Sequence, residues 1–296
     1  MNFELNLFEN SIEYFFDSLD YYAIANEHGE HDQQRSDLES KKKWKLAFVF
    51  IVQAIELLAK EVLYRTNPTL IFENIDNPIN SSSKTVSFVK LLSRLRNFIS
   101  DALTEQESLF LNSCANIRNA FVHYKVGISS PELKAKYCKL VSIFLSVYSK
   151  FIASDFNYKN EHYRYLVSEI LIFDDKYTVF RGEEMTLHAL EEFKKEIEAN
   201  ERQRYYIDRD GIKYPRIRFG DENDAYMRNG HYELVSRSTC DFDFCGDCSA
   251  KKGEYHLDGC DWEVCPICFS QVLSCDCEVD LCDEEGKIYK SPYSMK

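Results

Sequence analysis

The sequence lacks three features that define common classes of protein. Its most apolar run, Leu46 to Val52, is soon interrupted by polar and charged residues and is too short to span a bilayer. Its first four residues include no lysine or arginine, which argues against a secretory signal. Its net charge of −13 argues against a general affinity for nucleic acid. These absences predict a cytoplasmic protein that makes no contact with a membrane.

The composition is that of a soluble globular protein, with 45% hydrophobic and 29% charged residues. A chain of 296 residues can bury a sizeable core and is expected to form more than one domain. We predict three parts: an α-helical bundle in residues 1–153, a small α+β connector in residues 154–239, and a zinc-bound, cysteine-rich module in residues 240–296.

Five segments of the first part have apolar residues at three- and four-residue steps, the spacing of an amphipathic helix. Thr104 and Glu107 form a capping box, in which each side chain satisfies the other residue's backbone amide, so a helix should begin there. In the connector, residues 163–180 predict a pair of strands around Asp174 and Asp175, and residues 205–214 predict a hairpin. The expected helices cover residues 4–25, 41–65, 86–99, 104 to just before Gly127, and 132–153, and a shorter one covers residues 187–197.

Charge is distributed unevenly along the chain. Between Asn77 and Lys150 there are ten lysines or arginines and four acidic residues. From Cys240 to Lys296 there are thirteen acidic residues and five lysines. The run from Ser108 to Tyr124 has no acidic residue at all. Any phosphate chemistry is therefore expected in the basic part of the chain.

Within this acid-free run, Arg118, Asn119 and His123 supply the groups needed to cleave an RNA phosphodiester without a metal. His123 can move a proton near neutral pH. Arg118 can place two donors on a phosphate and stabilise its growing charge, and Asn119 can donate to a non-bridging oxygen. The alternative is structural: an arginine that caps a carbonyl, and a histidine whose charge suits a helix C-terminus.

Residues 4–153 resemble the HEPN (higher eukaryotes and prokaryotes nucleotide-binding) family of helical bundles. The family signature is an arginine, a polar residue and then a histidine near the end of a helix, which Arg118, Asn119 and His123 match. Glu56 matches the acidic residue that these domains often carry on an earlier helix. The resemblance implies a metal-independent endoribonuclease acting on RNA in anti-phage defence, abortive infection or a toxin–antitoxin system. The resemblance also allows two other functions. The protein could be an inactive scaffold or adaptor, or it could bind nucleotides without cleaving RNA.

Arg118 and His123 are five residues apart, and such residues point about 140° apart on a regular helix. They cannot share a face unless the helix breaks between them or a second copy completes the site. The family resemblance implies the second arrangement, a homodimer whose motifs meet across a two-fold axis. Glu56 is either a solvent-facing partner of Lys60 or a residue that orients Arg118 and His123.

Nine of the eleven cysteines lie between Cys240 and Cys282. In a cytosolic protein such crowding indicates zinc rather than disulfides. Eight candidate ligands suit two tetrahedral structural sites, which leave no open position for water. The sequence leaves open which four ligands share a site. They form either two groups of four in sequence order, or one group made of the two Cys-x-x-Cys pairs. In the second case the remaining four candidates form a second or a partial site. The candidates are Cys245, Cys248, His256, Cys260, Cys265, Cys268, Cys275 and Cys277.

The run from His256 to Cys268 resembles a zinc-binding tail of uncharacterised bacterial proteins, which implies no particular activity. The acidity of this tail opposes contact with phosphate. We expect it instead to dock a protein partner, such as an antitoxin, or to cover the basic bundle. Cys240 and Cys282 are left over, and Cys114 and Cys138 lie on apolar helix faces where core packing is expected.

Overall fold

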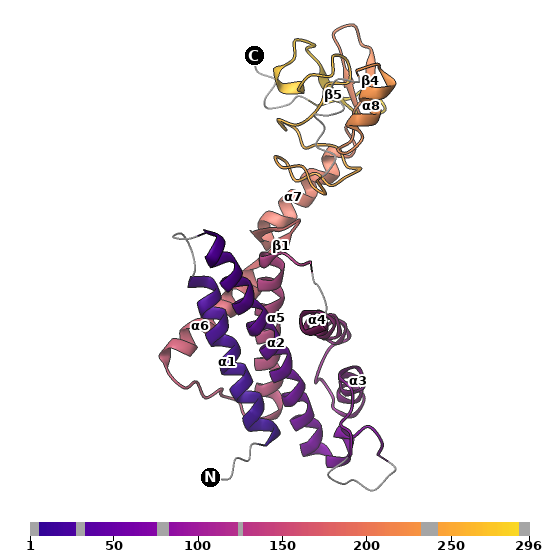
Figure 1. Cartoon of the computed structure of the whole chain (residues 1–296). Coiled ribbons are helices and arrows are strands. Elements are labelled where there is room, and N and C mark those ends of the chain that lie inside the picture. The colour runs from indigo at the N-terminus through magenta and orange to yellow at the C-terminus, as the bar shows by residue number, and fades with distance from the viewer. Residues whose placement is uncertain (1–5, 28–32, 76–82, 124–126, 232–241, 290–296) are drawn as a thin grey trace. The chain divides into compact units, whose positions relative to one another are not determined.

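The computed structural model describes residues 6–27, 33–75, 83–123, 127–231 and 242–289 (Figure 1). Contacts within the backbone divide the chain into two compact units, Met1–Met185 and Thr186–Lys296. We call them the helical unit and the cysteine-rich unit. This division differs from the three parts expected, because residues 154–185 group with the helices and residues 186–239 with the cysteine-rich segment.

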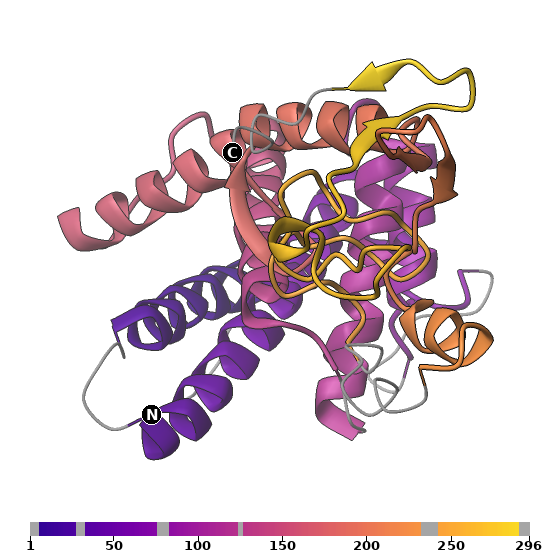
Figure 2. The same ribbon diagram turned by 90° about the horizontal axis from the view of Figure 1, so that it is seen from above.

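The helical unit consists mostly of α-helices, as the spacing of its apolar residues predicted. Its elements are α1 (Leu7–Glu27), α2 (Gln33–Thr66), η1 (Pro68–Ile71), α3 (Phe88–Phe98), α4 (Glu105–His123), α5 (Ser130–Phe151), α6 (Glu161–Lys176), β1 (Tyr177–Phe180) and β2 (Glu183–Thr186). Figures 1 and 2 show α1 and α2 side by side. Helix α2 also packs on α3, α4 and α5, and α5 packs on α6. Helix α2 is therefore the central element, against which α4 is positioned.

The apolar faces of these helices share one core. Phe15, Phe48, Phe144 and Tyr137 are fully buried, and the rings of Phe15 and Phe144 stack with centroids 4.3 Å apart. The buried hydroxyl of Tyr137 lies 3.2 Å from the hydroxyl of Ser18, which satisfies both polar groups. Burial of one such ring stabilises the fold by about 2–3 kcal/mol. Packing, more than the helix propensity of either segment, therefore holds α2 and α4 in place.

Capping boxes fix the starts of α4 and α5. Glu107 N donates to Thr104 Oγ1 at 3.1 Å, and Thr104 N donates to Glu107 Oε2 at 2.7 Å. The start of α4 predicted from this pair is thus confirmed. A second box, Ser129 with Glu132, begins α5. The direction in which the chain enters α4 is set by hydrogen bonds that lie within four residues of sequence.

The prediction of a pair of strands in residues 163–180 is wrong for most of that segment. Helix α6 covers this segment up to Lys176, and the side chain of Asn160 caps it by accepting a hydrogen bond from Tyr163 N at 3.1 Å. Val167 and Ile170, three residues apart, are both buried. A short apolar run does not distinguish a buried helix from a strand by periodicity alone. Only β1 is extended, and it pairs with β2.

In its described residues, the cysteine-rich unit has two α-helices, a short 3-10 helix and a small sheet. Its elements are α7 (Leu187–Asn200), β3 (Tyr205–Ile207), β4 (Lys213–Pro215), α8 (Glu222–Arg228), η3 (Val272–Ser274), β5 (Asp280–Cys282) and β6 (Ile288–Tyr289). The hairpin predicted around Gly211 is confirmed, since β3 and β4 pair antiparallel with Tyr206 opposite Tyr214. Strand β5 pairs with the other edge of β3, so the expected connector and the cysteine-rich tail share one sheet.

Candidate functional site

The side chain of Arg118 is held by Glu56 on a neighbouring helix. Arg118 Nη1 lies 2.8 Å from Glu56 Oε2, and Lys60 Nζ lies 2.8 Å from Glu56 Oε1. The exposed fractions of the Arg118, Glu56 and Lys60 side chains are 16%, 14% and 9%. The Glu56–Lys60 pair expected from the sequence therefore exists, but it is largely buried rather than solvent-facing. Glu56 uses its second oxygen to bind the arginine of the signature.

The group formed by Glu56, Lys60 and Arg118 carries a net positive charge. Burial alone would raise the pKa of Glu56, but hydrogen bonds and attraction from Lys60 and Arg118 outweigh it and lower the pKa below its ordinary value. Glu56 is therefore ionised at neutral pH. One carboxylate faces two cations, which leaves an excess positive charge beside α4. The guanidinium of Arg118 also lies over the ring of Phe88, 5.9 Å from its centroid.

Asn119 and His123 lie on a different face of α4 from Arg118. Helix α4 is continuous to His123, its last residue. Residues four apart on a helix differ by about 40° and residues five apart by about 140°, so His123 shares the face of Asn119. Both are exposed. Arg118 Nε donates to Asn119 Oδ1 at 3.2 Å. One chain therefore brings Glu56, Arg118 and Asn119 together and places His123 on the exposed side.

The face that carries His123 is a polar stripe along α4. By the same helical geometry, Ser108, Asn112, Asn119 and His123 fall within about 60° of one another over about 22 Å of helix. No acidic residue follows Glu107 on this helix. Exposed apolar residues lie on both sides of the stripe, Leu109 at 66% exposure and Val122 at 55%.

Cys245, Cys248, His256 and Cys260 form a first cluster, whose four donor atoms all lie within 4.8 Å of one another. The sulfurs of Cys245 and Cys260 are 3.7 Å apart, and His256 Nδ1 lies 3.5 Å from Cys248 Sγ and 3.1 Å from Cys260 Sγ. A tetrahedral metal with sulfur bonds of about 2.3 Å needs sulfurs about 3.8 Å apart, whereas a disulfide needs about 2.05 Å. The donor types and dimensions fit a metal ion.

Cys265, Cys268, Cys275 and Cys277 form a second cluster within the same distance limit. Cys265 is buried and Cys268 is exposed, whereas the first cluster has three buried members. The two clusters are the sequential sets of ligands, and the alternative that joins the two Cys-x-x-Cys pairs does not occur. Hydrogen bonds with Cys248 and Cys260 lower the pKa of Cys245, and hydrogen bonds with Cys245 and Cys248 raise the pKa of Cys260.

The two Cys-x-x-Cys pairs sit in loops of the same backbone form. In each loop the N–H of the first cysteine donates at 2.8 Å to the carbonyl of the residue five positions later. The residue after the second cysteine has a positive φ in each, 57° at Ser249 and 59° at Phe269. Isolated bridges close both loops, Phe244 with Lys251 and Val264 with Gln271. Similar loops therefore present the first two ligands of each cluster.

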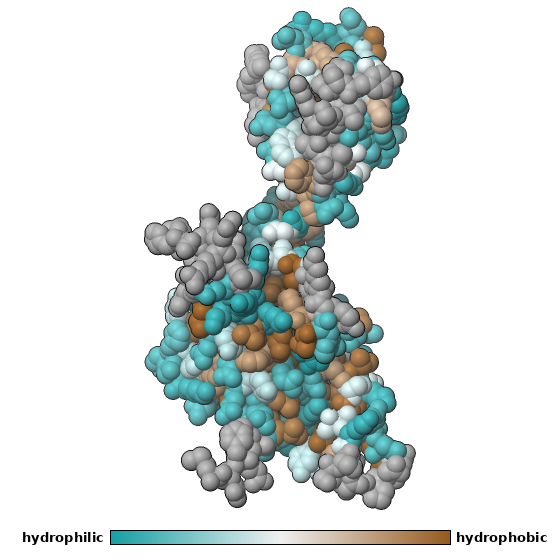
Figure 3. All heavy atoms as spheres, in the orientation of Figure 1, coloured by the Kyte–Doolittle hydropathy of each residue, from teal (hydrophilic) through white to brown (hydrophobic). Residues whose placement is uncertain are grey.

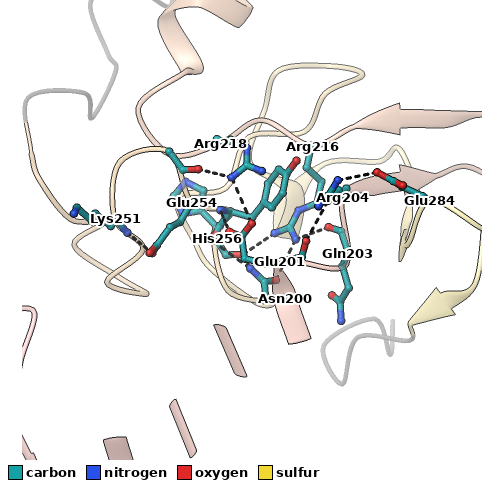
Figure 4. A network of polar contacts seen from close by, with 12 residues as sticks. Asn200, Glu201, Gln203, Arg204, Arg216, Arg218, Lys251, Glu254, His256 and Glu284 are labelled. Carbon is teal, nitrogen blue, oxygen red and sulfur yellow. Dashed lines mark hydrogen bonds and ion pairs between the residues drawn. The ribbon is translucent and has the colours of Figure 1, made fainter. Parts of the chain in front are cut away.

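A buried arginine supports the backbone of His256 (Figure 4). Arg216 Nη2 and Asn200 Nδ2 both donate to the carbonyl of His256, at 2.6 Å and 2.7 Å. Arg216 Nε lies 2.7 Å from Glu263 Oε1, with side-chain exposed fractions of 0% and 3%. Burial opposes the charge of Arg216, but Glu263 outweighs it and the pKa of Arg216 is raised. Because Glu263 lies between Cys260 and Cys265, this ion pair fixes the segment that joins the clusters.

The remaining cysteines are structural. Burial raises the pKa of Cys114 and of Cys138 to about 12, and both lie in the core of the helical unit, as expected. Cys282 is buried on β5. No disulfide joins any of the cysteines that the structure describes. Cys240 lies outside the described residues.

Sequence reasoning missed two residues next to the first cluster, Arg216 and Glu222. Neither belongs to a motif or lies at a ligand-like spacing, and each reaches His256 only through the fold. Figure 4 shows Arg216 beside His256. No local signal in the sequence would have identified either residue.

Within the described residues, no helix has the length and apolar content needed to cross a membrane. Comparison with protein-family models, with curated proteins and with solved structures gave no match to this chain. Function is therefore inferred from the geometry around Arg118 on α4 and from that of the two cysteine clusters.

Proposed function

We propose that this protein is a homodimeric, metal-independent endoribonuclease of the HEPN type. The observation that carries the proposal is the arrangement on α4, where Asn119 contacts the largely buried Arg118–Glu56 pair and His123 is exposed at the end of the same helix. The substrate is RNA and the site of action is the cytoplasm. The family resemblance extends the proposal to a role in anti-phage defence or in a toxin system.

In the proposed reaction His123 moves a proton, either from the ribose 2′-hydroxyl or to the leaving oxygen. A bond forms between the 2′ oxygen and phosphorus, and the bond from phosphorus to the 5′ oxygen breaks. The products carry a 2′,3′-cyclic phosphate and a 5′-hydroxyl. The imidazole is exposed at the end of α4, where a polynucleotide can reach it.

Arg118 stabilises the negative charge that develops on the phosphate. Its Nη1 is bound to Glu56 and its Nε to Asn119, whereas its Nη2 has no hydrogen-bond partner among the described residues. That donor is left for a phosphate oxygen. Glu56 acts as a positioning residue that holds the guanidinium, and the adjacent Lys60 keeps the net charge of the group positive.

A second copy of the chain is needed because α4 is unbroken and turns Arg118 and His123 about 140° apart. We propose that each site takes Arg118 from one copy and His123 from the other. Exposed apolar side chains on α3 and α4 support an interface there: Val89, Phe98, Leu109 and Val122 are 55% to 66% exposed. Figure 3 shows hydrophobic atoms at the surface of the helical unit.

The two clusters of the cysteine-rich unit would each hold a structural zinc ion. Thiolate and imidazole donors at tetrahedral distances suit zinc better than magnesium or calcium, which prefer oxygen. When bound, the ion supplies a four-way crosslink and no open coordination position. The cysteine-rich unit therefore takes no part in the cleavage step.

The deciding experiment measures cleavage of a single-stranded RNA in EDTA by the wild type and by His123→Ala. We expect activity of the wild type in EDTA and a loss of about 10²- to 10⁴-fold in the variant. The exposed His162 provides a control, since His162→Ala should retain full activity. Equal activity of the wild type and His123→Ala would reject the assignment. Zinc content of both proteins, measured before EDTA is added, separates loss of catalysis from loss of the cysteine-rich unit.

A second candidate is a non-catalytic adaptor or nucleotide-binding protein that docks a partner through the cysteine-rich unit. The adaptor is favoured over the nucleotide-binding protein by a cavity of about 480 Å³ in that unit, whose lining includes five carboxylates (Asp258, Glu263, Asp276, Glu278 and Asp280) and a single arginine, Arg209. Such a cavity suits a basic segment of a protein partner, such as an antitoxin. Saturable binding of a lysine-rich peptide, together with absent RNA cleavage, would favour the adaptor.

A further inference from the structure

Two buried polar atoms beside the first cluster have no hydrogen-bond partner among the described residues: Nε2 of His256 and Oε1 of Glu222. They lie 3.6 Å apart, and the exposed fractions of the two side chains are 1% and 3%. A buried donor or acceptor without a partner destabilises the folded state. The two atoms are therefore placed to satisfy each other.

The other nitrogen of His256 points at the cysteines. Nδ1 lies 3.5 Å from Cys248 Sγ and 3.1 Å from Cys260 Sγ, so it is the ligand atom of this ring. A nitrogen that donates its lone pair to a metal carries no proton, and the proton of the neutral ring must then lie on Nε2. Nε2–H is thereby aimed at the carboxylate of Glu222.

Glu222 is itself held in place. It is the first residue of α8, and its Oε2 accepts a hydrogen bond from Gly220 N at 2.8 Å. The backbone at Gly220 has a φ of +93°, a conformation that suits glycine. The edge of the Phe219 ring packs against His256, with centroids 5.4 Å apart and planes at 80°. One oxygen of Glu222 is thus fixed by backbone, and the other is left for the histidine.

We propose that Glu222 is a positioning residue for the first cluster, which selects Nδ1 of His256 as the metal ligand by accepting the proton on Nε2. Partners of this kind orient the imidazole and raise its basicity, and their loss costs about 10- to 100-fold in metal affinity. The second cluster consists of four cysteines and has no histidine, so Glu222 has no such role there. This inference rests on the proposed occupancy of the first cluster by zinc and is independent of RNA cleavage.

The first test uses the full-length chain and its two clusters as internal controls. Zinc is titrated in competition with a chelator of known affinity, for the wild type, Glu222→Gln and Cys268→Ser. We expect two ions per wild-type chain, a loss of about 10- to 100-fold at one site only in Glu222→Gln, and loss of the other site in Cys268→Ser. Unchanged affinity in Glu222→Gln, or an equal fall at both sites, would overturn the proposal.

The second test needs no variant. In the zinc-loaded wild type, nitrogen NMR of the His256 ring should show metal-bound Nδ1 and protonated Nε2, with the Nε2 proton shifted by a strong hydrogen bond. Metal on Nε2, or a proton on Nε2 in free exchange with water, would contradict the proposal. A wild-type chain that takes up no zinc would refute both this proposal and the proposed zinc sites, whatever its activity on RNA.

Discussion

Arg118 Nη1 and Glu56 Oε2 lie 2.8 Å apart and join α4 to α2 across 62 positions of sequence. The arginine of the signature is therefore part of the bundle's structure as well as a candidate for phosphate binding. Replacing Arg118 would remove the candidate phosphate-binding group and would also leave Glu56 with Lys60 as its only ionic partner. A loss of activity would therefore combine a chemical and a structural effect. His123 is exposed at the helix end, and its replacement tests the chemistry with little change to packing.

Replacing Glu56 with glutamine should destabilise the helical unit by about 3 kcal/mol, because two largely buried cations lose their counter-charge. Urea denaturation followed by circular dichroism measures this. Glu61→Gln is the matched control: Glu61 pairs with Arg65 on the same helix at 2.8 Å, but the arginine is 45% exposed, so we expect a loss below about 1 kcal/mol. Equal effects of the two variants would contradict a special role for Glu56.

The stability of the helical unit should depend on pH through Glu56. Its pKa is lower in the folded protein than the ordinary value of 4.5. The unfolded chain therefore binds the proton more readily, and the contribution of Glu56 is present above the ordinary pKa and lost as pH falls through the folded pKa. The stability difference between the wild type and Glu56→Gln should shrink as the pH falls below the ordinary pKa of 4.5 toward the lower folded pKa. A difference that stays constant as the pH falls below 4.5 would count against the ion pair.

A mixture of two inactive variants should recover activity if each site takes residues from both copies. When Arg118→Ala and His123→Ala chains exchange subunits at random, about half of the dimers contain one chain of each kind. Each mixed dimer has one intact site out of two, so about a quarter of wild-type activity is expected. RNA cleavage before and after subunit exchange measures the recovery. No recovery in dimers that demonstrably exchange would show that both residues must act within one copy.

Removal of metal should unfold the cysteine-rich unit and leave the helical unit intact. The hydrophobic clusters that include the cysteine loops have only four buried members each, which is too small a core to hold these loops without a crosslink. A zinc chelator should abolish the thermal transition of this unit and leave the transition of the helical unit unchanged, as calorimetry would show. A single transition, unaffected by the chelator, would argue against structural metal.

Arg216→Ala should destabilise the cysteine-rich unit by about 3–5 kcal/mol, because Glu263 is then a buried charge without a partner. Arg204→Ala is its control, since Arg204 pairs with Glu284 at 2.8 Å but both side chains are more than half exposed. We expect a change below about 1 kcal/mol for the control. Chemical denaturation of the zinc-loaded protein compares the two variants.

Several features of this protein are determined by its sequence alone, because they depend on neighbours close in the chain. Apolar residues at helical spacing predicted α1 to α5, although α2 begins at Gln33 rather than at the expected Lys41, and the Thr104–Glu107 box located the start of α4. The hairpin around Gly211 followed from its turn residues. The clustered cysteines and His256 were recognisable as candidate metal ligands from donor type and crowding, since each Cys-x-x-Cys loop places its own two sulfurs.

Only the tertiary structure decided which distant groups meet. Packing of α4 on α2 gives Arg118 its partner Glu56, and the pairing of β5 with β3 joins the tail to the hairpin. The fold also grouped the ligands in sequence order and placed Glu222 beside His256. Local periodicity cannot select such contacts. They depend on how buried surfaces fit together and on which buried charges find a counter-charge, and both are properties of the whole chain.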